Sequence, residues 1–168
     1  GTEADQLVIP IRASQKQLEI IRDGRKLVLV TGGSRAGKTQ VAQLWFLRQI
    51  LMRGGRDSLF WIMGPDTRAA WIALTKLLWG SGSTAPVIPP TVEGDPMLCR
   101  SMPDRERGRN AKSKLTKFLD GSLLDLRPLD RIDASRIRGE SITAGLVEEA
   151  SAVKSSENLI DAQNRVVD

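Results

Sequence analysis

The chain has 168 residues, of which 40% are hydrophobic and 27% are charged, with 25 Lys and Arg against 20 Asp and Glu. This length fits one domain that buries roughly 68–70% of its unfolded surface, and the composition excludes a disordered or fibrous protein. One cysteine and no histidine are present. An internal disulfide, the usual zinc sites and Ser/His or Cys/His catalytic pairs are therefore excluded.

Neither membrane insertion nor secretion is expected from the sequence. No apolar run approaches the roughly 20 residues that span a bilayer, and the first residues, GTEADQ, lack the basic and apolar stretches of a signal peptide. We therefore expect no membrane partner and a reducing compartment.

The first predicted elements are a helix, a strand and a second helix. Residues 11–22 have apolar positions typical of a short helix, which ends at the Asp23-Gly24 turn. The run LVLVT, residues 27–31, is apolar and β-branched like a buried parallel strand. Apolar residues recur at helical spacing over residues 38–52, and Gly54-Gly55 ends this helix.

A second unit has the same order of strand and helix. The run SLFWIM, residues 58–63, is predicted to be a strand. Asp66 or Thr67 can cap the following helix, which extends to about Trp79. Residues 80–96 are rich in Gly, Pro and Ser and are too long for a simple turn, so we expect an excursion at the surface.

Three strands and one helix complete the predicted elements. Residues 97–101 and 117–127 have strand patterns, and Asp120-Gly121 indicates a hairpin turn in the second of them. Residues 142–147, ITAGLV, form another apolar strand, and residues 155–166 a closing helix. This order predicts an α/β fold with a mostly parallel, twisted sheet flanked by helices.

Residues 32–39, GGSRAGKT, match the phosphate-binding pattern G-x-x-x-x-G-K-[ST]. A strand and a helix flank it, as required for main-chain N–H groups and a helix N-terminus to surround the phosphates, so we expect it on a central strand. Lys38 would reach the β- and γ-phosphates of ATP, and the Thr39 hydroxyl would bind Mg²⁺. The alternative is a glycine-rich turn with an exposed lysine. The residues expected to contact the nucleotide are Gly32, Gly33, Ser34, Arg35, Ala36, Gly37, Lys38, Thr39 and Gln40.

Two carboxylates, Glu148 and Glu149, follow the strand predicted over residues 142–147. Parallel strands present their ligands at their carboxyl ends, so we expect the pair on a strand next to that of the glycine-rich motif. Glu148 would bind Mg²⁺ through water, and Glu149 would orient the attacking water. The alternative is a pair of solvated side chains at the end of a strand.

These motifs together resemble the ATPase domain of the large terminase subunit, the motor that packages DNA in tailed bacteriophages. The family has a glutamine before the P-loop, an arginine within it, a Leu-Arg-Gly-like element and an acidic pair followed by alanine. Here these features are Gln17, Arg35, residues 137–139 (IRG) and residues 147–151 (VEEAS). Residues 120–139 are also similar to the family's hairpin and the connection that follows it.

The resemblance implies ATP hydrolysis that drives double-stranded DNA into a procapsid, in the host cytoplasm. The implied partners are the portal protein, the small terminase subunit and further copies of the chain in a ring, although this piece alone can be monomeric. Gln17 would read the adenine, and Arg138 would act as an arginine finger toward a neighbouring subunit's ATP. Arg35 is the alternative finger, because a guanidinium in the P-loop can also neutralise charge on the γ-phosphate.

The resemblance also implies an ASCE-type P-loop NTPase fold that is truncated after the Walker B strand. Many family members have Asp-Glu where this chain has Glu148-Glu149. We expect a single ATPase domain, in which residues 1–25 are a helical segment on the adenine side and residues 26–168 are the nucleotide-binding core. The chain ends nineteen residues after Glu149 (168 minus 149), before the family's coupling motif and nuclease domain, so DNA cleavage is not expected.

Residues 100–117 contain seven Lys and Arg and two Asp and Glu, a net charge of +5 (seven minus two) that equals the charge of the whole chain. This segment either contacts a DNA backbone or forms a solvated or subunit-facing loop. It lacks interleaved aromatic residues, which disfavours single-strand binding. The four tryptophans are expected to pack in the core or an interface: Trp45, Trp61, Trp71 and Trp79.

Two other functions remain open from the sequence. One is a different P-loop enzyme, either a helicase-like ATPase or a nucleotide kinase, and a kinase would transfer phosphate to an acceptor instead of water. The other is a module that binds nucleotide or DNA without catalysis, in which Glu149→Gln would leave phosphate release unchanged.

Overall fold

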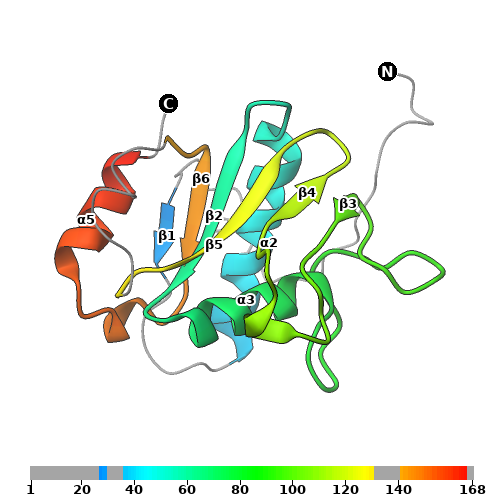
Figure 1. The fold of residues 1–168 in the computed structure, drawn as a ribbon, viewed down its shortest axis with the longest axis horizontal. Coiled ribbons are helices and arrows are strands. Elements are labelled where there is room, and N and C mark those ends of the chain that lie inside the picture. Colours follow the sequence, from blue (N-terminus) through cyan, green and yellow to red (C-terminus); the bar gives the residue numbers. More distant parts are fainter. Residues whose placement is uncertain (1–26, 30–35, 131–140, 166–168) are drawn as a thin grey trace.

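The computed structural model describes residues 27–29, 36–130 and 141–165 (Figure 1). The helix predicted over residues 11–22 lies outside them. The strands are β1 (Leu27–Leu29), β2 (Leu59–Gly64), β3 (Cys99–Ser101), β4 (Thr116–Phe118), β5 (Leu123–Pro128) and β6 (Ala144–Val147). The helices are α2 (Ala36–Arg53), α3 (Thr67–Leu78) and α5 (Ser156–Arg165), with the 3₁₀ turns η2 (Gly108–Asn110) and η3 (Ala150–Ala152).

The strands form one mixed sheet in the order β1-β6-β2-β5-β4-β3. β1, β6, β2 and β5 are parallel to one another, whereas β4 and β3 continue the sheet in antiparallel pairs. β4 is antiparallel to β5 because the predicted turn at Asp120-Gly121 joins them directly, with Gly121 at a φ of 92°. The α/β class and the flanking helices are confirmed, and the sheet is parallel only in part.

The position of β1 differs from the prediction. A central strand was expected before the glycine-rich motif, and this is wrong for the described sheet, in which β1 lies at one edge. β6 occupies the inner position between β1 and β2, and all four of its residues are buried. An apolar run without alternation is typical of such a strand, which is covered on both faces. The prediction that the strand before the acidic pair neighbours the strand before the motif is confirmed.

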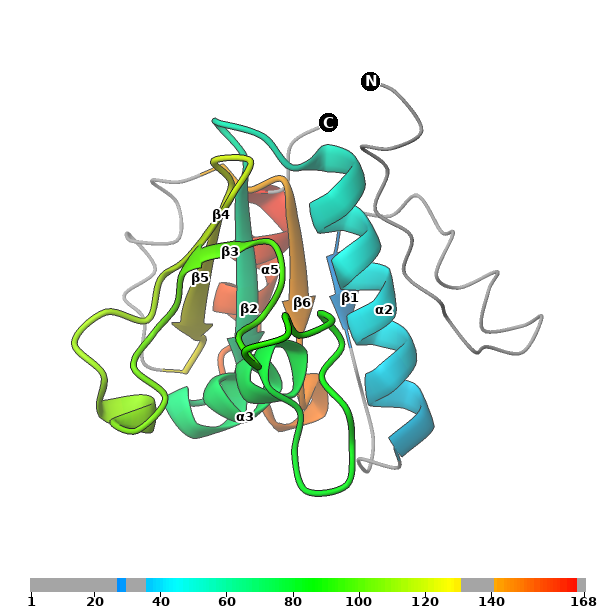
Figure 2. The ribbon, with the colours of Figure 1, turned by 90° about the vertical axis from the view of Figure 1, so that its right-hand side faces the viewer.

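α2 and α3 cover one face of the sheet with a continuous apolar core, and Figure 2 shows α2 and α5 on opposite sides of the strands. Trp45 and Phe46 of α2 are completely buried, and the Phe46 ring meets the edge of the Phe60 ring at a centroid distance of 6.1 Å. Trp71 and Trp79 are half-buried against the same core. The expected packing role of these tryptophans is confirmed.

α5 covers the other face. Ala162 of α5 packs there with Trp61 and Met63 of β2 and Val147 of β6. The Asp130 carboxylate accepts hydrogen bonds from two main-chain N–H groups immediately before α5, at 2.8–3.0 Å. Alternate residues of β2 therefore belong to two different cores, which explains why the run SLFWIM has no polar face.

The turn from β2 into α3 is tightly packed. Asp66, one of the two predicted caps, accepts a hydrogen bond from the Ala69 N–H at 2.8 Å and begins the helix. Gly64 lies directly against this first turn, since a Cβ there would be 2.8 Å from the main-chain nitrogen of Ala70. This contact holds α3 at the carboxyl end of β2.

Gly64→Ala is expected to lower the free energy of unfolding by about 2 kcal/mol, because the added methyl group overlaps main-chain atoms that cannot rotate away. Urea denaturation measures the effect. Gly55→Ala is the control, because the nearest atom to its Cβ is the Ser58 Oγ at 3.9 Å. If both variants were equally stable, the close packing of β2 on α3 would be contradicted.

Candidate functional site

The carboxyl ends of the parallel strands β1, β6 and β2 lie together at one end of the sheet, which is the lower end in Figure 1. Val147 of β6 pairs with Leu29 of β1 and with Met63 of β2. Glu148 is the next residue, and residues 30–35, which include the first half of the glycine-rich motif, follow Leu29. The register therefore brings the acidic pair beside the point where the chain leaves β1 toward the motif.

α2 begins at Ala36, within the motif. Its first turn contains no acidic residue, and its free N–H groups and positive dipole end favour an anion. Thr39 is buried in this turn with 6% exposure, whereas Gln40 is exposed. The structure describes only the helical backbone of Ala36, Gly37 and Lys38. The earlier motif residues Gly32, Gly33, Ser34 and Arg35 lie outside the described residues.

Glu148 is a buried carboxylic acid at this edge. It is 7% exposed, its N–H donates to the Met63 carbonyl at 2.8 Å, and its Oε1 has no hydrogen-bond partner among the described residues. Burial raises the pKa of Glu148 to about 7; the charge of Lys76 acts against this shift and the charge of Glu149 adds to it. A buried, unpartnered carboxylate oxygen is costly unless a cation or a donor approaches it.

Lys76 is a charged residue near Glu148 that the sequence did not single out. It is half-buried on α3, and its positive charge lowers the pKa of Glu148. A buried hydrogen bond of 2.9 Å, which the Gln43 side chain of α2 donates to the Ala73 carbonyl, joins α3 to α2. The helix was predicted from local spacing, but the effect of Lys76 on Glu148 depends on how α3 packs in the tertiary structure.

Glu149 has a strained backbone. Its φ of 52° and ψ of 43° are left-handed, a conformation that costs a non-glycine residue about 1–2 kcal/mol. Its carbonyl accepts the Ala152 N–H at 2.9 Å, which begins the η3 turn, and its side chain is exposed. The two glutamates therefore differ in environment: Glu148 is buried, and Glu149 faces solvent.

The residues present fit a magnesium ion that is shared with phosphates. The described residues contain no group of three or more His, Cys, Asp or Glu able to hold a metal alone. Magnesium at a nucleotide site, however, takes one or two protein oxygens and otherwise water and phosphate oxygens. The Thr39 hydroxyl and the Glu148 Oε1, which has no partner among the described residues, are oxygens of that kind, and both residues are buried.

Besides Gly32, Gly33 and Ser34, three predicted site residues lie outside the described residues: Gln17, Arg35 and Arg138. Their roles toward the adenine and the γ-phosphate stay predictions. The single cysteine, Cys99, begins β3, which is the edge strand opposite to β1 in the sheet. Burial raises the pKa of its thiol to about 12. This thiol stays protonated near neutral pH and is not a nucleophile.

Comparisons of the chain with protein-family models, with curated proteins and with solved structures found no match. No helix in the part of the chain that the structure describes combines the length and apolarity needed to cross a bilayer.

Proposed function

We propose that the chain is the ATPase domain of a DNA-packaging motor of the terminase type, with an ASCE-type P-loop NTPase fold. The observation that supports hydrolysis best is the register of β1 with β6, in which Leu29 pairs with Val147, so that the buried carboxylic acid Glu148 directly follows this pair and the glycine-rich motif follows Leu29 in the sequence. The terminase assignment rests on the sequence features around Gln17, Arg35, residues 137–139 and residues 147–151.

In this proposal the motif amides and the α2 N-terminus bind the phosphates of ATP, and Lys38 contacts the β- and γ-phosphate oxygens. Thr39 and Glu148 hold Mg²⁺, which when bound neutralises charge on the phosphates. Glu149 orients the water that attacks the γ-phosphate in line with the leaving oxygen. Arg138 of a neighbouring subunit, or Arg35, stabilises the charge on the transferred group.

The partners in this proposal are those of a packaging motor. Hydrolysis would move double-stranded DNA through a portal protein, with a small terminase subunit and a ring of identical chains. The exposed positive charge of residues 100–117 supports a polyanionic partner.

The test is binding of ATP with Mg²⁺ by calorimetry, together with release of phosphate. Lys38→Ala is expected to weaken ATP binding by at least about tenfold, because it removes a charge-assisted contact to the phosphates. Lys154→Ala is the control, since this exposed lysine precedes α5. Unchanged affinity in the Lys38 variant would contradict the phosphate site.

Product analysis separates the other functions that the sequence left open. Transfer of labelled γ-phosphate to an acceptor in place of water would indicate a kinase. Binding of ATP without release of phosphate, even at high protein concentration, would indicate a module without catalysis.

A further inference from the structure

Residues 100–117, called the basic segment below, carry a net charge equal to that of the whole chain, so the other 150 residues sum to zero. The segment connects β3 to β4 and contains η2. Among its seven basic side chains only Lys114 is half-buried; the exposed ones are Arg100, Arg105, Arg107, Arg109, Lys112 and Lys117. The net positive charge of the chain therefore lies in one segment, and most of it is exposed.

The basic segment has a defined internal structure. The Asp104 carboxylate accepts hydrogen bonds from the N–H groups of Glu106 and Arg107 at 3.0 and 3.4 Å. Gly108 has a left-handed φ of 59°, and the Lys114 Nζ donates to a main-chain carbonyl at 3.1 Å. Asp104, one of the two acidic residues of the segment, therefore has its carboxylate engaged by the main chain of the turn.

The segment is also attached to the core through α3. The Arg105 guanidinium lies 5.4 Å from the centroid of the Trp79 ring, a cation–π contact. Trp79 in turn packs against Trp71 with ring centroids 6.1 Å apart, and Gly108 lies beside the Trp71 indole. Arg105 and the turn at Gly108 thus attach the segment to α3 and the residue that follows it.

A hollow of about 340 Å³ opens on this surface. Its lining includes the apolar side chains of Met102 and Ala111 and the polar ones of Arg107, Lys112 and Ser113. The Arg107 guanidinium is 3.7 Å from Asp104, so this pair is partly neutral, whereas Lys112 extends into solvent. The basic side chains at the rim of the hollow are Arg107 and Lys112, and an anion can approach them there.

We propose that the basic segment binds the sugar–phosphate backbone of a nucleic acid duplex. Exposed Lys and Arg side chains that recur along one segment match the repeated charges of a duplex backbone. Single strands fit poorly because the nearest tryptophans, Trp71 and Trp79, are half-buried against the core and against each other, and Arg105 lies over the Trp79 ring. An acidic protein fits poorly because such interfaces need an apolar centre, and none of the exposed large hydrophobic residues in the described chain lies within the segment.

This inference deepens the proposed function by naming the surface that would contact DNA, and its test needs no nucleotide. A labelled duplex of about 30 base pairs is titrated at about 50 mM and about 200 mM salt, with binding followed by fluorescence anisotropy. The triple variant Arg107→Gln, Arg109→Gln, Lys112→Gln is expected to bind the duplex at least about tenfold more weakly at the lower salt and to reduce the salt slope by about 2–3.

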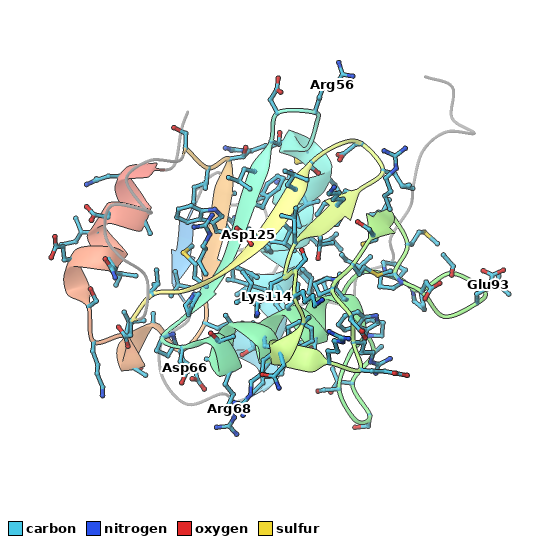
Figure 3. The ribbon with its side chains drawn as sticks, in the orientation of Figure 1. Arg56, Asp66, Arg68, Glu93, Lys114 and Asp125 are labelled. Carbon is cyan, nitrogen blue, oxygen red and sulfur yellow. The ribbon has the colours of Figure 1, made fainter. Side chains whose placement is uncertain are left out.

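The control variant removes the same charge elsewhere: Arg56→Gln, Arg68→Gln, Lys154→Gln. All three side chains are exposed outside the basic segment, and Figure 3 shows Arg56 at the end of the molecule opposite to Arg68. Near wild-type duplex binding by this control, with loss in the test variant, supports the proposal. Equal loss in both variants would mean that total charge alone attracts the duplex and would overturn it.

Three further results would overturn the proposal: no duplex binding by the unaltered chain, tighter binding of the single strand, and equal binding of polyglutamate at the same surface. ATP affinity is measured on the same variants. If the test variant binds ATP normally but loses the duplex, the duplex surface is separate from the nucleotide site. If the chain binds the duplex but never binds ATP, the proposed ATPase fails and the inference stands.

Discussion

Glu148→Gln is expected to raise the free energy of unfolding at pH 8 by about 3 kcal/mol when no nucleotide or metal is present. Burial raises the pKa of Glu148 from 4.5 to about 7, with Lys76 partly opposing the shift. Between these pH values the folded chain holds a proton that the unfolded chain has lost, so its free energy of unfolding falls as the pH rises. Glutamine keeps the shape of the side chain and removes the buried charge.

The measurement is urea denaturation at pH 4 and at pH 8. At pH 4, below both pKa values, the carboxyl group is protonated in both states and the variant should differ little from the unaltered chain. Glu93→Gln is the matched control, because Glu93 is exposed on the surface excursion (Figure 3) and its charge is solvated at both pH values. A stability difference for Glu148→Gln that is the same at pH 4 and pH 8 would contradict the buried charge.

The same variant is expected to weaken magnesium-dependent binding of ATP by about tenfold or more, because a neutral amide attracts Mg²⁺ and its bound water less strongly than a carboxylate does. A gain in stability together with a loss of binding is typical of a group that is kept for function. If Glu148→Gln gained stability and bound Mg²⁺-ATP normally, Glu148 would have no role toward the metal.

Glu149→Gln is expected to reduce the rate of ATP hydrolysis by about a hundredfold or more while ATP binding stays unchanged, because it removes the carboxylate that orients water. The exposed side chain and the left-handed backbone are kept, so the free energy of unfolding should not change. Steady-state phosphate release and calorimetric ATP binding measure the two quantities. Full hydrolysis by this variant would remove Glu149 from the mechanism.

Glu149→Gly separates the backbone strain from the chemistry. Glycine adopts a φ near 52° without steric cost, so this variant should be more stable by about 1 kcal/mol. It should be as inactive as Glu149→Gln, because both lack the carboxylate. An unchanged or lower stability of the glycine variant would contradict the left-handed conformation.

The elements themselves follow from local chemistry. The helix predicted from Asp66 to about Trp79 is observed as α3 from Thr67 to Leu78, because its cap and its apolar spacing lie within the same short segment. The strands over residues 58–63 and 142–147 are observed as β2 and β6 with ends shifted by one or two residues. Apolar runs bounded by turn residues need no distant partner to be recognised.

For the candidate site, the pairing of β1 with β6 was predicted from the sequence and is observed, whereas the roles of its residues stay predictions. The pairing could be predicted because neighbouring parallel strands present the residues that follow them at the same end of the sheet. Lys76 could not be predicted, because its approach to Glu148 depends on how α3 docks against α2.

The amino-acid order alone determined the elements, the α/β class and the chemical groups available at the ends of the strands, since capping, apolar spacing and glycine turns act over a few residues. Only the tertiary structure decided that β1 lies at the edge of the described sheet, that Glu148 is buried and Glu149 exposed, and that the basic segment rests on two tryptophans. These outcomes depend on which surfaces exclude water together, a property of contacts between residues far apart in the chain.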